Sequence, residues 1–222
     1  MLIYGTGGHA AVVRSVLLAQ KTGIVAAFDD DFNKEQFFDQ PILSPYNSLL
    51  FASEKLIIAV GNNANRRAIA GKVKHAFGNA IHPSVLVNET FLIKCGTVIM
   101  HNAILQARVL AGMHCIINTG AIVEHDCNLG DFVHVAPGAI LCGGVMVGAG
   151  SLIGAGSIVN PNLNIGKNCI IGAGSIVTRN VPDGATVYGN PARIKPAHYE
   201  IQNSAIAAAH EREGNELHSG SI

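Results

Sequence analysis

The chain has 222 residues, 14% of them charged, and its basic and acidic residues balance to a formal net charge of zero. This composition provides no basic field for nucleic acid. Its apolar runs are far shorter than a membrane span, and a predicted strand directly follows Met1 in place of a signal peptide, so we expect a cytoplasmic enzyme with no membrane insertion.

The N-terminal part of the chain, residues 1–80, alternates short apolar strands with amphipathic helices. Strands are predicted at residues 2–4, 24–28 and 55–60, and helices at 11–20 and 65–76. This β-α-β order predicts an α/β domain with a small, Rossmann-like parallel sheet over residues 1–80.

A glycine-rich turn follows the first predicted strand. Gly5, Gly7 and Ala10 match the spacing of the dinucleotide-binding fingerprint, in the strand-to-helix context that it requires. Such a turn brings backbone N–H groups and a helix N-terminus to a phosphate. A domain of this length is about half of a dinucleotide fold, so a single nucleotide fits better than NAD. The alternative is that the glycines only form a tight turn.

From Ile81 to Val177 an aliphatic residue returns every six positions, and Ala111 is the one position that is not Ile, Leu or Val. A second register, four positions further on, is free of charge as well. A fixed six-residue period predicts a parallel β-helix, in which three hexapeptides form one coil of a triangular prism. Equivalent positions of successive coils then stack in columns. We assign this prism to residues 81–195.

Cysteines and histidines in the prism raise the question of a metal site. Cys115, Cys127 and Cys169 occupy the second register, and no CxxC pair is present, so we expect small buried side chains rather than disulfides or zinc ligands. No metal site is predicted, because no two of the prism histidines share a column; these are His82, His101, His114, His125 and His134.

His125 stands out because carboxylates flank it on both sides, Glu124 and Asp126. Its place in the hexapeptide faces outward. An adjacent carboxylate fixes the tautomer of a histidine and favours the protonated ring, which together make a minimal general base. A solvated corner histidine would show the same pattern.

Three groups of motifs together resemble the PglD/NeuD-type sugar acyltransferases, a hexapeptide-repeat family. The active-site segment is similar to residues 118–135, which contain Glu-His-Asp at 124–126. The nucleotide-sugar-binding half is similar to residues 4–9, 28–30 and 59–63, which read Tyr-Gly-Thr-Gly-Gly-His, Phe-Asp-Asp and Ala-Val-Gly-Asn-Asn. The closing motif of hexapeptide acyltransferases is similar to residues 187–193.

The resemblance implies a left-handed β-helix and an acetyl-CoA-dependent N-acetyltransferase. The expected acceptor is a nucleotide-linked amino sugar of the UDP-4-amino-4,6-dideoxy type, as in the UDP-N-acetylbacillosamine pathway. Acetyl-CoA is the expected co-substrate, and the expected assembly is a homotrimer with sites between adjacent prisms. His125 would be the general base, Asp126 would raise its basicity with Glu124 as a rival, and Asn118 would position the reacting groups.

The same resemblance assigns the binding residues. His134 would contact the thioester end of acetyl-CoA, and Ala155 and Ala173, which share one column of the prism, would form a smooth wall for pantetheine. The nucleotide-sugar pocket would contain Gly7, Gly8, His9, Asp29, Asp30, Gly61 and Asn62. The carboxylates of residues 29–30 could accept hydrogen bonds from ribose or sugar hydroxyls. Solvated carboxylates of a loop would show the same sequence pattern.

Other readings stay open at this stage. One is O-acetylation of sialic acid or a related sugar, another is a non-catalytic nucleotide-binding scaffold, and a third is an NAD-linked or regulatory module. A free prism would expose outward apolar residues such as Leu141 and Val145, or their neighbours, which is compatible with a buried face. Residues 196–222 match no known pattern, and 205–213 are weakly helical, so this tail is either disordered or an extra helix.

Overall fold

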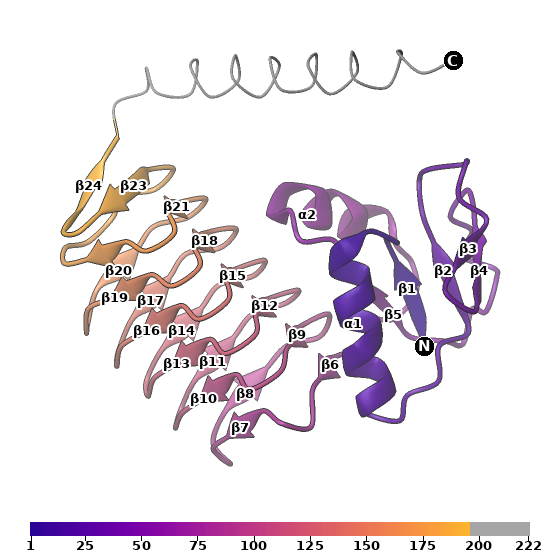
Figure 1. Ribbon diagram of the computed structural model, residues 1–222, viewed down its shortest axis with the longest axis horizontal. Helices are drawn as coiled ribbons and strands as arrows, with labels where there is room; N and C mark the ends of the chain where they lie inside the picture. Colours follow the sequence, from indigo (N-terminus) through magenta and orange to yellow (C-terminus); the bar gives the residue numbers. More distant parts are fainter. Residues whose placement is uncertain (196–222) are drawn as a thin grey trace, which may run out of the picture.

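The computed structural model describes residues 1–195 and contains an α/β domain that packs against a three-sided prism of short strands (Figure 1). The predicted fold class is confirmed, because the parallel β-helix follows a small and mostly parallel α/β sheet. The expectations for residues 196–222 lie outside the described part of the chain. No helix within residues 1–195 is long and apolar enough to cross a membrane.

The α/β domain has one five-stranded sheet in the order β3-β4-β2-β1-β5. Its central strands are fully buried because both faces are covered: α1 and the prism pack on one face, and α2 packs on the other. The elements are β1 (Leu2–Tyr4), α1 (Gly8–Ala19), β2 (Ala26–Phe28), β3 (Gln36–Phe37), β4 (Gln40–Leu43), β5 (Leu56–Ile58) and α2 (Asn63–Lys72).

The sequence predicted these elements with shifted ends and missed one hairpin. Both helices begin earlier than expected, α1 at Gly8 and α2 at Asn63, because Gly7 and Asn62 take extended backbone angles and cap them. The side chain of Asn62 accepts a hydrogen bond from the N–H of Asn65 at 3.0 Å. The hairpin β3–β4 is antiparallel, and its short strands lack the apolar alternation by which strands are recognised.

The prism has three faces, and the chain visits them in a fixed order. The docking face, against which the α/β domain packs, contains β6 (Ala80–Ile81), β9 (Val98–Ile99), β12 (Ile116–Ile117), β15 (His134–Val135), β18 (Leu152–Ile153), β21 (Ile170–Ile171), β23 (Thr186–Gly189) and the antiparallel β24 (Ala192–Ile194). The isoleucine face contains β7 (Leu86–Val87), β10 (Ile104–Leu105), β13 (Ile122–Val123), β16 (Ile140–Leu141), β19 (Ile158–Val159) and β22 (Ile176–Val177). The third face contains β8 (Leu92–Ile93), β11 (Leu110–Ala111), β14 (Asn128–Leu129), β17 (Met146–Val147) and β20 (Asn164–Ile165).

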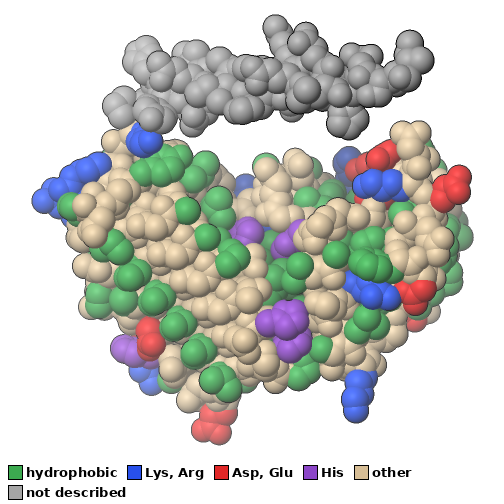
Figure 2. All heavy atoms as spheres, in the orientation of Figure 1, with side chains coloured by type: hydrophobic (Ala, Val, Ile, Leu, Met, Phe, Trp, Pro, Cys, Tyr) green, Lys and Arg blue, Asp and Glu red, His purple; other side chains and the backbone are tan. Residues whose placement is uncertain are grey.

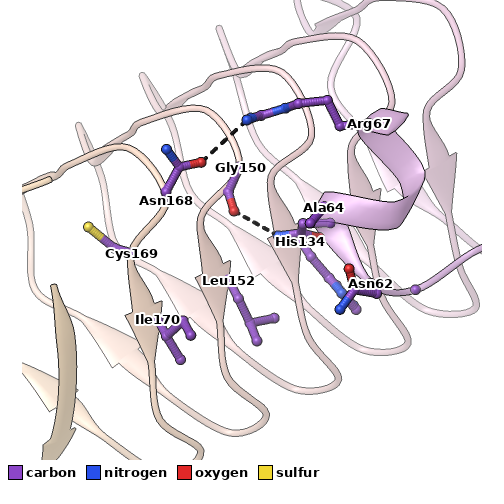
Figure 3. Close-up of a pocket in the computed structure, with 11 residues that line it drawn as sticks. Asn62, Ala64, Arg67, His134, Gly150, Leu152, Asn168, Cys169 and Ile170 are labelled. Carbon is purple, nitrogen blue, oxygen red and sulfur yellow. Dashed lines mark hydrogen bonds between the residues drawn. The ribbon is translucent and has the colours of Figure 1, made fainter. Parts of the chain in front are cut away.

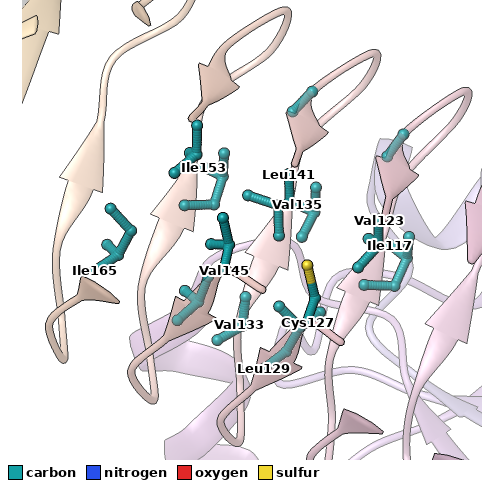
Figure 4. Close-up of a cluster of buried hydrophobic side chains, with 14 of the residues drawn as sticks. Ile117, Val123, Cys127, Leu129, Val133, Val135, Leu141, Val145, Ile153 and Ile165 are labelled. Atoms are coloured by element: carbon teal, nitrogen blue, oxygen red, sulfur yellow. The ribbon is translucent and has the colours of Figure 1, made fainter. Parts of the chain in front are cut away.

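In the two-residue strands of the prism between β8 and β22, the second residue points inward and stacks on its equivalent in the next coil, as the parallel register Leu105–Val123–Leu141 shows. Figure 4 shows these inward aliphatic side chains together with Cys127 in the core. Cys115, Cys127 and Cys169 are buried free thiols, which confirms the small inward register.

The expectation that Leu141 and Val145 face outward is wrong, since both are fully buried. Leu141 is the second residue of β16, so the pleat turns it inward and places its neighbour Ile140 outside. The outward first positions on the isoleucine face are all aliphatic: Leu86, Ile104, Ile122, Ile140, Ile158 and Ile176. Figure 2 shows rows of apolar side chains crossing the visible prism surface.

Candidate active site

A cavity of about 460 Å³ lies where β1 and β5 end and α1 begins, and it is lined by residues of the predicted glycine-rich turn. Gly5 has φ +97°, and a Cβ there would lie 2.8 Å from Val60 Cγ2, so the turn requires glycine at this position. A Cβ on Gly7 or Gly8 would meet nothing within 4 Å. Gly7 caps α1 without a side-chain hydrogen bond, which leaves the first N–H groups of the helix facing open space.

The two predicted acidic residues line this cavity, and both already have partners. Asp29 Oδ2 accepts from the Thr6 N–H at 2.8 Å, from the Thr6 hydroxyl and from Lys34. Burial alone would raise the pKa of Asp29, but the hydrogen bonds from Thr6, the Asp31 N–H and Lys34 outweigh it and lower the pKa. Asp30 accepts from the Tyr4 hydroxyl at 2.6 Å. Asp29 therefore closes the glycine-rich turn as well as lining the pocket.

A second cavity of about 280 Å³ lies between the start of α2 and the docking face. Figure 3 shows Asn62 and Arg67 on one side, and His134, Leu152 and Ile170 on successive prism strands on the other. Gly61 lines both cavities, so they meet at this residue. The first cavity lies within the α/β domain, and the second is the groove between the α/β domain and the docking face.

Two histidines stand where the cavities meet. The ring centroids of His9 and His134 are 6.4 Å apart, and His134 Nε2 lies 3.1 Å from the Asn118 amide nitrogen. His9 Nε2 is buried and has no hydrogen-bond partner. Burial, followed by the nearby charge of Arg66, lowers the pKa of each ring to about 4. Both imidazoles are therefore neutral at pH 7.

Arg66 of α2 joins the two domains beside these histidines and is 1% exposed. Its guanidinium donates to the carbonyls of Val60 and Gly61 and to the Asn63 side chain, and across the interface to the carbonyls of His114 and Phe132, at 2.8 to 3.1 Å. Burial lowers its pKa to about 10, so Arg66 stays charged at neutral pH. These bonds fix Gly61 relative to the strand that begins with His134.

The predicted catalytic pair occupies a different part of the prism. His125 and Asp126 are exposed in the turn from β13 to β14, and His125 Nδ1 lies 2.8 Å from Asp126 Oδ2. This hydrogen bond directs Nε2 away from the carboxylate. Asp126, rather than Glu124, is the carboxylate in contact with the ring. Hydrogen bonds from Arg108 and then from His125 hold the pKa of Asp126 well below its usual range.

Gly143 lies one coil beyond His125 and directly under its ring. A Cβ on Gly143 would lie 2.6 Å from His125 Cε1 and 2.7 Å from Nε2, where a real side chain does not fit. The backbone of Gly143 is not in the left-handed region, so the space required by the ring, rather than the turn, requires glycine here.

The structure brings some predicted residues together and separates others. His9 and His134 lie close together where the two cavities adjoin, Asn118 contacts His134, and Gly61 and Asn62 line the groove. Ala155 and Ala173 are exposed where the docking face turns into the isoleucine face. His125 lies where the isoleucine face turns into the third face, which is the corner opposite the docking face. Within one chain the apolar core stands between His125 and the groove.

Several residues of the site were missed by the sequence analysis. Gly143 and Arg108 each lie one coil away from a member of the His125–Asp126 pair, so the column rule already placed them in contact with it. Arg66 joins distant segments of the chain, at His114 and Phe132, and no local pattern signals such contacts. Within residues 1–195 no three His, Cys, Asp or Glu side chains are grouped to hold a metal ion.

Comparison with known proteins supports the same two-domain reading. Residues 1–73 match the PglD N-terminal domain family, and residues 144–179 match the bacterial transferase hexapeptide family (six repeats). The chain is 33% identical over 164 residues to the GDP-perosamine N-acetyltransferase of Escherichia coli O157:H7, which covers 71% of each protein. It is 42% identical over 107 residues to the UDP-N-acetylbacillosamine N-acetyltransferase of Bacillus subtilis (strain 168), a match over 44% of this chain and 50% of that protein.

A solved structure resembles almost the whole described chain. It is a histidine variant of the perosamine N-acetyltransferase of Caulobacter crescentus in complex with CoA and GDP-perosamine, with a TM-score of 0.84 and 34% identity. The similarity covers 88% of this chain and 96% of that one. The fold and site thus define a two-domain hexapeptide-repeat acyltransferase. Within that class, the chain belongs to the nucleotide-sugar N-acetyltransferase family with a PglD-type N-terminal domain.

Proposed function

We propose that the protein transfers the acetyl group of acetyl-CoA to the amino group of a nucleotide-linked 4-amino-4,6-dideoxy sugar, with His125 as the general base. The observation that carries this proposal is the hydrogen bond between His125 and Asp126 on a prism that is joined to a nucleotide-sized pocket. The perosamine N-acetyltransferase named above shares the two-domain fold and was solved in complex with CoA and GDP-perosamine. We also propose that the enzyme works in the cytoplasm, as expected for an enzyme that uses acetyl-CoA and a nucleotide sugar.

The chemistry follows from the state of the His125 ring. With Nδ1 donating to Asp126, Nε2 accepts a proton from the sugar amine as its nitrogen attacks the thioester carbonyl. Asp126 stabilises the imidazolium that forms. The tetrahedral intermediate then collapses, the C–S bond breaks, and the imidazolium returns the proton to the CoA sulfur. Direct transfer agrees with the burial of the inward cysteines, which raises the pKa of Cys115 to about 12 and that of Cys127 to about 11 and leaves both as inert thiols.

We further propose that the active site is shared between neighbouring chains of a trimer. The outward aliphatic ladder of the isoleucine face supports this arrangement, since a contiguous apolar patch of this kind is typical of an interface. In this arrangement the isoleucine faces of three chains pack around a threefold axis. The prism corner that carries His125 in one chain then lies next to the corner that carries Ala155 in the neighbouring chain. His125 of one chain would then face the His134 groove of its neighbour.

The first test is a substrate panel. Acetyl-CoA is incubated with UDP-, GDP- and dTDP-linked amino sugars, thiol release is followed, and the product is analysed for an N-acetyl group. We expect release only with a nucleotide-linked amino sugar. Acetylation of sialic acid hydroxyls, without activity on any nucleotide sugar, would favour the O-acetyltransferase alternative.

The second test concerns the base. His125→Ala should lower kcat by about 10²–10⁴-fold, the usual contribution of a general base, while acetyl-CoA still binds. Asp126→Asn should cost less, because Asp126 orients the ring without taking the proton. A larger loss from Glu124→Gln than from Asp126→Asn would show that the wrong carboxylate is assigned. An unchanged kcat in His125→Ala would show that His125 is not the general base, and a wild type without any acetyl transfer would favour the non-catalytic scaffold.

The third test mixes two inactive variants, His125→Ala and Ala173→Trp, whose indole would fill the proposed pantetheine path. A trimer assembled from both contains some sites with the intact His125 of one chain and the intact wall of its neighbour. We therefore expect the mixture to regain part of the activity. The absence of rescue in mixed trimers would place both elements in the same chain.

A further inference from the structure

Arg108 and Asp126 form an ion pair built by the repeat itself. They occupy the same turn position in adjacent coils, and both have left-handed backbone angles, φ +60° and +63°. Their side chains therefore leave the prism corner in parallel. Arg108 Nε lies 2.6 Å from Asp126 Oδ1, and Arg108 Nη2 lies 2.9 Å from Asp126 Oδ2.

This bidentate geometry fixes the carboxylate plane, because both of its oxygens are held by one rigid guanidinium fork. Asp126 Oδ2 also lies 2.8 Å from His125 Nδ1, so Arg108, Asp126 and His125 form a continuous hydrogen-bonded chain. Stability does not explain the ion pair, since both side chains are largely exposed, 65% and 44%, and exposed ion pairs contribute little.

Resting on the proposed function, we propose that Arg108 is a positioning residue that acts on the general base through Asp126. It holds the carboxylate in the one orientation that keeps Nδ1 of His125 as donor and Nε2 free for the amine. Without Arg108 the carboxylate rotates on an exposed turn, and the ring loses its fixed direction. Lysine at this position keeps the charge but not the two-point geometry.

A double-mutant cycle on the intact trimer tests this. Arg108→Gln should lower kcat by about 10-fold, the order of loss expected from misplacing a reacting group, with the KM for acetyl-CoA unchanged. Arg108→Lys should recover part of the loss. In an Asp126→Asn background, Arg108→Gln should cost nothing more, because its effect passes through the carboxylate. Additive losses, or a raised KM with unchanged kcat, would overturn the inference.

Nitrogen NMR of the His125 ring provides a readout that does not depend on turnover. The wild type should show one tautomer with the proton on Nδ1, and Arg108→Gln should show a mixture of both tautomers. A single unchanged tautomer in Arg108→Gln would refute the inference even if the enzyme acetylates sugars as proposed. A tautomer mixture would support it even if no sugar in the panel is acetylated. Arg14→Gln is the control, because it breaks the comparable Arg14–Asp39 pair at 2.5 Å far from His125 and should leave kcat and the ring spectrum unchanged.

Discussion

The position of the His125 ring depends on the absence of a side chain at Gly143 as much as on the hydrogen bond to Asp126. Gly143→Ala should lower kcat by about 10–10²-fold, because the added methyl group would displace the imidazole from its place above the turn. The measurement is kcat with saturating acetyl-CoA and sugar. Gly71→Ala is the matched control, since a Cβ there meets nothing within 4 Å and should leave kcat unchanged. Full activity in Gly143→Ala would show that the ring can work from another orientation.

A buried histidine should make the protein sensitive to acid. His114 is 2% exposed between Phe77 and Phe132, and its Nδ1 has no hydrogen-bond partner. Burial and then Arg66 lower its pKa to about 4 from an ordinary 6.5, so the unfolded chain binds the proton first as the pH falls. Stability is therefore present above pH 6.5 and is lost between about pH 6.5 and 4.

The variant His114→Asn tests this residue, because asparagine tolerates the left-handed backbone (φ +55°) and does not titrate. It should be less stable than the wild type at pH 8, since the ring contacts are lost. Between pH 8 and pH 5, however, its free energy of unfolding should fall by about 1–2 kcal/mol less than that of the wild type. An undiminished pH dependence, measured by urea unfolding at both pH values, would point to His9 and His134 instead.

At the scale of elements, α2 connects the two domains through the hydrogen bonds of Arg66. Arg66→Lys should destabilise the protein by about 2–4 kcal/mol, because an ammonium group cannot satisfy the five acceptors that the buried guanidinium reaches. Arg67→Lys, at the next position and exposed, should change the free energy of unfolding by less than about 0.5 kcal/mol. Equal effects of the two substitutions in urea unfolding would show that Arg66 does not join the domains.

The prism strands were predictable because one register alone satisfies the repeat. Once an inward residue such as Leu141 is known, its neighbour in the strand, such as Ile140, must point outward. The expectation that Leu141 faces outward was wrong because Leu141 itself belongs to the inward six-residue register. The hairpin β3–β4 was not predictable, since a short strand with Pro41 carries no periodic signal. The contact of His125 with Asp126 was expected from adjacency. The hydrogen bonds from Arg66 to His114 and Phe132 depend on how the two domains pack against each other, and no local sequence pattern predicts this packing.

At the scale of the whole molecule, the isoleucine face should control assembly. If the proposed trimer forms through this face, Ile158→Glu should convert it to monomers, because the substitution would bury a charge at the threefold axis. Met146→Glu changes a comparably outward side chain on the third face and should leave the trimer intact. Light scattering distinguishes the two. Monomers from Met146→Glu alone would place the interface on the third face.

The outward residues of the docking face have different roles at the two ends of the sheet. Val98 and Ile116 are 1% exposed in the core beneath α1, so substitutions there endanger folding. Leu152 and Ile170 continue the same column above His134, where they line the groove without supporting the domain contact. Substitutions at Leu152 and Ile170 therefore leave the hydrophobic core between the domains unchanged. Point substitutions at Leu152 and Ile170 can therefore change the shape of the groove while the buried residues Val98 and Ile116 stay constant.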